Sequence, residues 1–242
     1  SEMCIRDSSY YCRVAVTPYG KKAKVSINDS ALTITKADSL LVLLSGGTNY
    51  STETANYRTN ESVLHQRIDD IINKALAKNY TTLKTRQQKS HRMLFDRCQL
   101  SITPDDCNTK PTPQLVADYN KTDSSYLDNH FLEELYFNYG RYLLISCAQG
   151  IALPSNLQGI WNYSNSAVWH CDIHANINVQ MNYWPAEVTN LSELHNNLLD
   201  YIYNEALIHT QWRDNVNTVL RSANKNENQK PGGFFCSTAN NI

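Results

Sequence analysis

Apolar and polar residues alternate over the first fifty positions of the chain. Short apolar runs are separated by the turn-forming residues Pro18–Gly20, Asn28–Asp29 and Gly46–Gly47. A period of two, interrupted by turns, predicts consecutive antiparallel strands with one buried face. The predicted strands are residues 12–16, 23–27, 31–35 and 40–44. Four strands are too few for a stable sandwich, so we expect residues 9–59 to be the C-terminal part of a β-sandwich domain.

The hydrophobic period becomes helical after residue 60. Apolar residues such as Val63, Ile68 and Ile72 recur at helical spacing with charged residues between them, which predicts one or two linker helices up to about residue 95. Cys98–Ile102 alternates again and predicts a further strand. The following residues are rich in Pro, Asp, Asn and Thr, which is typical of a loop. We therefore expect residues 60–110 to form a helical linker with one strand.

From residue 111 to residue 242 the pattern is helical. Apolar steps of three and four predict a helix over residues 131–146 that ends before Gly150. A second long helix is predicted over residues 191–208, with Asn190 as its N-cap and Glu193 completing a capping box. Between them, a helix is predicted to begin near Val179. We expect it to end near Tyr183 or Trp184, because Pro185 restricts the residue before it.

The charge balance narrows the classes of partner. The chain has 22 basic and 23 acidic residues, whereas nucleic acids and anionic membranes require a strong basic excess. The longest apolar run, Ser39–Ser45, is far shorter than the roughly 20 residues that span a bilayer. The seven cysteines contain no CxxC pair, which favours small buried residues. We expect a neutral or polar substrate, no nucleic acid, no membrane span and no cofactor.

Candidate chemistry is concentrated between the two long predicted helices, where amides and aromatic rings crowd residues 153–187. Aromatic rings stack on the C–H faces of sugars, and amides both donate to and accept from hydroxyls. The candidate substrate-binding residues are Trp161, Asn162, Trp169 and His174. The alternative is an Asn-rich loop whose amides bind its own backbone.

Asn176 and Asn178 are two residues apart. On a regular helix such residues point in roughly opposite directions, so both amides reach one ligand only from an extended or turn segment. The pair therefore predicts an irregular stretch that leads into the helix near Val179.

Two other classes of protein remain open at this point. His170, Cys171, Asp172 and His174 have the chemistry of zinc ligands, although their spacing matches no closed zinc motif. Alternatively, the amides and aromatic rings would belong to a carbohydrate-binding module without catalysis.

Four longer strings resemble glycoside hydrolase family 95, a family of α-L-fucosidases. They are Ser90–Arg97, Leu135–Ile145, Leu153–Asn162 and Trp169–Glu187. The resemblance extends over nearly all of residues 10–242. It implies an α+β multidomain protein with an N-terminal β-sandwich, a helical linker and an (α/α)6 barrel, of which residues 111–242 would be the N-terminal part.

The resemblance also implies an activity, the inverting hydrolysis of terminal α-L-fucosyl or, in some members, α-L-galactosyl linkages of oligosaccharides. By motif, Asn176 and Asn178 correspond to the asparagines that position the attacking water, and His174 to a sugar ligand. The acid glutamate and the base aspartate are expected beyond the C-terminal end of this chain. We therefore expect residues 1–242 alone to be inactive.

Both ends of the sequence suggest a fragment. Ser1–Ser8 resembles the translation of an adapter used in DNA sequencing libraries and is excluded from the fold. The resemblance implies that the full-length protein is exported, to the periplasm or outside the cell.

Overall fold

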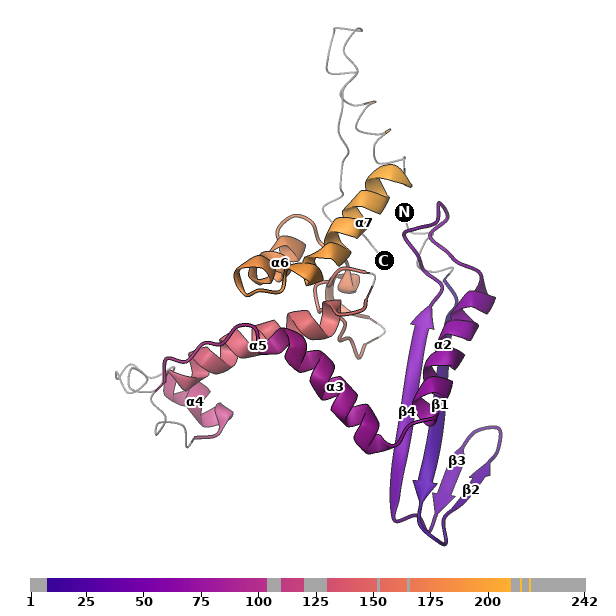
Figure 1. Ribbon diagram of the computed structural model, residues 1–242. Coiled ribbons are helices and arrows are strands. Elements are labelled where there is room, and N and C mark those ends of the chain that lie inside the picture. Colours follow the sequence, from indigo (N-terminus) through magenta and orange to yellow (C-terminus); the bar gives the residue numbers. More distant parts are fainter. Residues whose placement is uncertain are drawn as a thin grey trace, which may run out of the picture. The chain divides into compact units, whose positions relative to one another are not determined.

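The computed structural model describes residues 8–103, 110–119, 130–151, 153–164, 166–209, 214 and 218 (Figure 1). The chain divides into two compact units, residues 1–89 and 90–242. Both strands and helices are present, as the predicted α+β class requires. The proposed adapter, apart from Ser8, lies outside the described residues. The domain limits expected from the sequence, including the boundary near residue 110, stay predictions.

The described part of the first unit contains four strands, at the positions that the sequence predicts. They are β1 (Tyr10–Tyr19), β2 (Lys24–Ile27), β3 (Leu32–Thr35) and β4 (Ser39–Thr48). The strands do not all pair in consecutive order, because β1 pairs antiparallel with β4 while β2 and β3 form a separate hairpin. The turn of this hairpin is stabilised by Asn28, whose side-chain oxygen accepts from the backbone N–H of Ala31 at 2.7 Å.

Helix α2 (Glu61–Leu76) covers one face of the β1–β4 pair (Figure 1). Leu64, Ile68 and Ile72 lie one turn apart on the same side of α2 and are almost fully buried. Gly47 of β4 lies against this face, since a Cβ there would meet the terminal methyl groups of Leu64 and Ile68 at 3.5 Å. A second helix, α3 (Tyr80–Phe95), runs across the division between the units. The helical pattern predicted between residue 60 and about residue 95 is therefore present, and its role as a linker stays a prediction.

The second unit is helical in its described part. Its elements after α3 are α4 (Thr112–Tyr119), α5 (Phe131–Ala148), η2 (Val168–Cys171), α6 (Asn178–Val188), η3 (Ser192–His195) and α7 (Asn196–Leu207). Their core joins the end of α3 to α5, α6 and α7 through Leu94, Ile145, Val179, Tyr183, Ala186, Leu191, Leu194, Leu198 and Tyr201. The helix predicted over residues 131–146 is confirmed as α5. Within the described ranges, no helix is long and apolar enough to cross a membrane.

The strand predicted at Cys98–Ile102 is wrong. These residues form no strand, because side chains of α5 bind the backbone polar groups that a neighbouring strand would otherwise bind. Glu134 accepts from the N–H groups of Ile102 and Thr103, each at 2.5 Å. Arg141, two turns further along α5, donates to the carbonyl of Cys98 at 2.7 Å. The alternating pattern of Cys98–Ile102 therefore belongs to a segment that is bound along helix α5 and is not part of a sheet.

Two predicted helix ends are also wrong. Helix α6 continues past Tyr183 and through Pro185 to Val188. Asn190 ends α6 instead of capping the next helix: its φ is 57°, its N–H donates to Glu187, and the N–H of Leu191 donates to Ala186. This pair of bonds is a Schellman motif, which favours Asn or Gly in the left-handed position. Helix α7 then begins only at Asn196, after the short helix η3.

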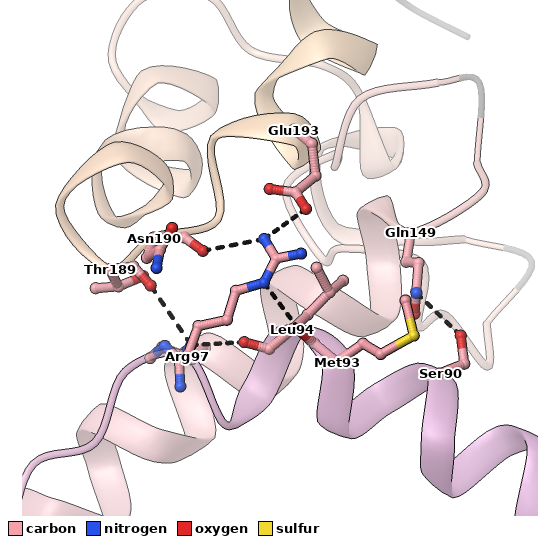
Figure 2. Close-up of polar contacts among 9 residues, drawn as sticks. Ser90, Met93, Leu94, Arg97, Gln149, Thr189, Asn190 and Glu193 are labelled. Atoms are coloured by element: carbon pink, nitrogen blue, oxygen red, sulfur yellow. Dashed lines mark hydrogen bonds and ion pairs between the residues drawn. The ribbon is translucent and has the colours of Figure 1, made fainter.

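The end of α3 is held against the loop between α6 and η3 by polar contacts (Figure 2). Arg97 donates to the carbonyl of Met93 at 2.8 Å and forms an ion pair with Glu193 at 2.5 Å. The glutamate that the sequence assigns to a capping box therefore binds an arginine from a distant element. On the neighbouring turn of α3, the hydroxyl of Ser90 accepts from the Gln149 amide at 3.1 Å.

The contact of Glu134 gives stability a pH dependence. The N–H groups of Ile102 and Thr103 hold the pKa of Glu134 below its ordinary value of 4.5. A carboxylate with a lowered folded-state pKa stabilises the fold above its ordinary pKa, and this contribution is lost as the pH falls through the folded value. We expect Glu134→Gln to weaken the loss of stability between about pH 6 and about pH 3, measured by urea unfolding. If the free energy of unfolding fell equally steeply with pH in the wild type and in Glu134→Gln, this assignment would be contradicted.

Candidate active site

The amide-rich segment begins on a buried platform, which is formed by side chains of α5, α6 and α7. The Tyr183 hydroxyl accepts from the N–H of Ser155 at 3.0 Å and donates to the side-chain oxygen of Asn197 at 2.9 Å. The Asn197 amide donates to the carbonyl of Leu153 at 3.0 Å, and the Cys147 thiol lies 2.7 Å from the Ser155 hydroxyl. Burial raises the pKa of both Tyr183 and Cys147, so both keep their protons at neutral pH.

A tight turn lies on this platform and leads to Trp161. The backbones of Asn156 and Gly159 bond to each other in both directions, and Gly159 has a φ of 68°. The ring of Trp161 packs against this glycine, where a Cβ would come within 2.7 Å of the indole. Only glycine combines this φ with this contact at low cost. Trp161 is thereby fixed on one side while about half of it stays exposed, at 45 %.

The next candidate residue, Trp169, lies in a strained turn. Trp169, His170 and Cys171 have φ values of 54°, 56° and 56°, three left-handed residues in succession without a glycine. Each costs roughly 1 kcal/mol or more, and such strain is concentrated at functional sites. Bonds on either side compensate: the Cys171 thiol donates to Gln158 at 2.6 Å, and the N–H of Leu157 donates to the carbonyl of Asp172 at 3.1 Å.

His174 lies beside this strained turn. Its ring meets that of Trp169 edge to face, with centroids 5.9 Å apart. Its Nε2 lies 3.7 Å from a carboxylate oxygen of the buried Asp172, which is too long for a hydrogen bond. Among the described residues, this Nε2 has no hydrogen-bond partner. An aromatic ring, a carboxylate and a buried imidazole nitrogen are thus brought together.

Asn176 and Asn178 lie where the chain enters α6. Asn176 belongs to the turn before the helix, and Asn178 is the first helical residue, one position before the predicted start. The turn is closed by the N–H of Val179, which donates to the carbonyl of His174 at 2.9 Å. The non-helical stretch predicted from the spacing of the two asparagines is therefore present.

The asparagines of the segment differ in what their amides bind. Asn162 donates to the carbonyl of Ser164 at 2.8 Å and accepts from its N–H at 2.9 Å, as the backbone-binding alternative expects. In contrast, the side chains of Asn176 and Asn178 form no hydrogen bond within the part of the chain that the structure describes. Their donors and acceptors are therefore available to a ligand. The roles of all the candidate residues stay predictions.

Sequence reasoning did not assign a role to Asn182. Its side-chain amide donates to the carbonyls of Ser155 and Asn156, at 3.4 Å and 3.1 Å. It lies one helical turn after Asn178, and this spacing of four was the available signal that both belong to one face of α6.

The zinc alternative finds no support in the described residues. No group of three or more His, Cys, Asp or Glu side chains is arranged there to hold a metal ion. His170 and Cys171 lie in the strained turn, and the Cys171 thiol is engaged by Gln158.

The chain resembles three curated proteins over most of its length. It is 30% identical over 200 residues to "Probable alpha-fucosidase A" of Aspergillus niger, covering 80% of this chain and 25% of the relative. It is 32% identical over 192 residues to "Probable alpha-fucosidase A" of Aspergillus oryzae, covering 76% of this chain and 26% of the relative. It is 30% identical over 178 residues to "Alpha-L-fucosidase 2" of Arabidopsis thaliana, covering 73% of this chain and 21% of the relative. The chain thus spans about a quarter of the length of these relatives.

A family model places the candidate residues in a known domain. Residues 79–238 match the glycosyl hydrolase family 95 catalytic domain. This range contains the buried platform, the turns that carry Trp161 and Trp169, and the start of α6. The match confirms the resemblance seen in the motifs: this chain belongs to glycosyl hydrolase family 95.

Proposed function

We propose that this chain supplies the sugar-binding and water-positioning half of a glycosidase that cleaves terminal α-L-fucosyl linkages with inversion. The observation that carries the proposal is the pair of unengaged amides, Asn176 and Asn178, at the start of α6 beside His174. The names of the three relatives support fucosides as the substrate class. α-L-galactosides, which differ by one hydroxyl group, are the second substrate to test.

The amides suit the chemistry of inversion. In that reaction a water oxygen bonds to the anomeric carbon as the bond to the leaving oxygen breaks; a general base takes the proton of the water, and a general acid protonates the leaving group. An asparagine amide both accepts from and donates to water, so two fixed amides hold a water molecule on one face of the sugar ring. Asn176 and Asn178 perform this task without a proton transfer of their own.

The remaining candidate residues suit the sugar. The exposed rings of Trp161 and Trp169 offer faces for the C–H surface of fucose. His174 is proposed to contact the sugar beside Trp169, against whose ring it lies. Asn162 contributes by shaping its loop, because its amide is engaged by Ser164. No cofactor enters this mechanism.

The acid and the base belong, by family resemblance, to a later part of the domain. Each typically contributes about 10²–10⁴-fold to the rate, so purified residues 1–242 are expected to release no fucose. The β-sandwich, the (α/α)6 barrel and the export of the full-length protein are likewise proposals that rest on the resemblance.

The test is hydrolysis of an α-1,2-fucosylated oligosaccharide by the full-length protein, followed by proton NMR. We expect β-L-fucose to appear first and to convert to the equilibrium mixture, since inversion changes the anomeric configuration. Initial α-L-fucose would exclude inversion. Binding of the oligosaccharide without release of fucose would favour a non-catalytic carbohydrate-binding module, and an α-L-galactoside assayed in parallel measures the preference for the sugar.

A further inference from the structure

Two adjacent residues of α6 hold the backbone of the segment that leads to Trp161. Asn182 donates from one amide nitrogen to the carbonyls of Ser155 and Asn156, and the Tyr183 hydroxyl accepts from the N–H of Ser155. Helix α6 therefore binds both polar groups of the Ser155 backbone. Asn178 lies on the same helix, one turn before Asn182.

This segment joins the candidate substrate-binding turns. The carbonyl of Asn156 that accepts from Asn182 also accepts from the N–H of Gly159, which closes the turn against which Trp161 packs. One residue further on, the N–H of Leu157 donates to Asp172, the residue that adjoins the strained turn and lies beside His174. A shift of this backbone would therefore move the surroundings of Trp161 and of His174 relative to α6.

We propose that Asn182 and Tyr183 are positioning residues, which hold the turn carrying Trp161 at a fixed spacing from Asn178. The proposal deepens the fucosidase function proposed above and rests on it. Under that function, Trp161 binds the sugar while Asn178 holds the water. The position of the Trp161 turn then decides how tightly the sugar binds in front of that water.

The chemistry of the two side chains fits a holding role. The Asn182 amide nitrogen is the donor in both of its bonds, so an aspartate of equal size would lose them and place a carboxylate oxygen against two carbonyls. Tyr183 is only 3% exposed and stacks on His195 with centroids 5.4 Å apart. Removing its hydroxyl leaves the ring in place but strips a partner from a buried N–H, the costly way to lose a hydrogen bond.

The test uses Asn182→Ala, Asn182→Asp and Tyr183→Phe in the full-length protein. Matched controls are Asn196→Ala and Tyr203→Phe, both exposed on α7. Amide hydrogen exchange is measured by mass spectrometry in peptides covering residues 153–162. Kinetics are measured with p-nitrophenyl α-L-fucoside. We expect exchange and KM each to rise about tenfold in the three variants while kcat falls less than about threefold, because the water-holding amides stay on α6.

Several results would overturn the proposal. One is unchanged amide exchange in the 153–162 peptides. Another is an Asn182→Asp variant that behaves as the wild type, because the size of the side chain, and not its donor nitrogen, would then hold the segment. A lower Tm with unchanged KM would reduce both residues to structural ones. If the wild-type protein hydrolyses no fucoside, the proposed function fails, and the exchange measurement by itself still shows whether Asn182 and Tyr183 hold the segment.

Discussion

Replacing Asn178 with alanine in the full-length protein is expected to lower kcat by about 10²–10³-fold, the usual cost of removing one preorganised hydrogen-bonding group. Asn178 is the first residue of α6, and its side chain forms no hydrogen bond within the described ranges. Its loss is therefore expected to remove the proposed contact to the water and none to the fold. We expect the free energy of unfolding to change by less than about 0.5 kcal/mol.

The matched control for this prediction is Asn196→Ala, which deletes an exposed amide from the first residue of α7. Asn176→Ala provides a second arm, since both amides are assigned to the same water. Steady-state kinetics with a fucosylated oligosaccharide give kcat, and urea unfolding gives stability. Turnover of Asn178→Ala at the wild-type rate would remove the role assigned to this residue. A large loss of stability would show instead that the amide supports the fold.

The contrast between Asn178 and Asn162 shows where prediction from the sequence ends. Both are asparagines in an amide-rich segment, and both were candidates for contact with the sugar or its attacking water. Their difference depends on whether a backbone group lies within reach, as Ser164 does for Asn162. That depends on the path of the loop, which hydrophobic periodicity does not describe. The spacing of Asn176 and Asn178 was sufficient only to predict a turn before the helix.

The fold shows the same division between local and distant information. Strands β1 to β4 and helix α5 lie where the sequence predicts them, whereas the long helix predicted over residues 191–208 is divided into η3 and α7. The pairing of β1 with β4 was missed, because strand alternation is local and does not specify a partner. Cys98–Ile102 alternates like a strand, yet Glu134 and Arg141 of α5 bind its backbone. Asn190 suits an N-cap by composition, but its left-handed φ ends the preceding helix.

Arg141 is the residue whose loss is expected to destabilise the second unit most. Arg141 is 1% exposed, and its guanidinium donates to the carbonyls of Leu94, Phe95 and Cys98 at 3.1, 2.6 and 2.7 Å. It also donates to Thr189 at the end of α6, at 3.4 Å. The last carbonyls of a helix have no partner within the helix, so one cation here satisfies the ends of both α3 and α6.

Arg141→Ala is therefore expected to lower the free energy of unfolding by about 3–5 kcal/mol, because four carbonyls at the ends of α3 and α6 lose the guanidinium as a donor. Arg141→Lys should recover little, since one ammonium does not span acceptors on two helices. The control is Arg92→Ala, an exposed arginine of α3, with an expected change below about 0.5 kcal/mol. Urea unfolding measures all three. Equal stability of the Arg141→Ala and Arg92→Ala variants would mean that water replaces the guanidinium, and that the other contacts at the end of α3 are sufficient to hold it.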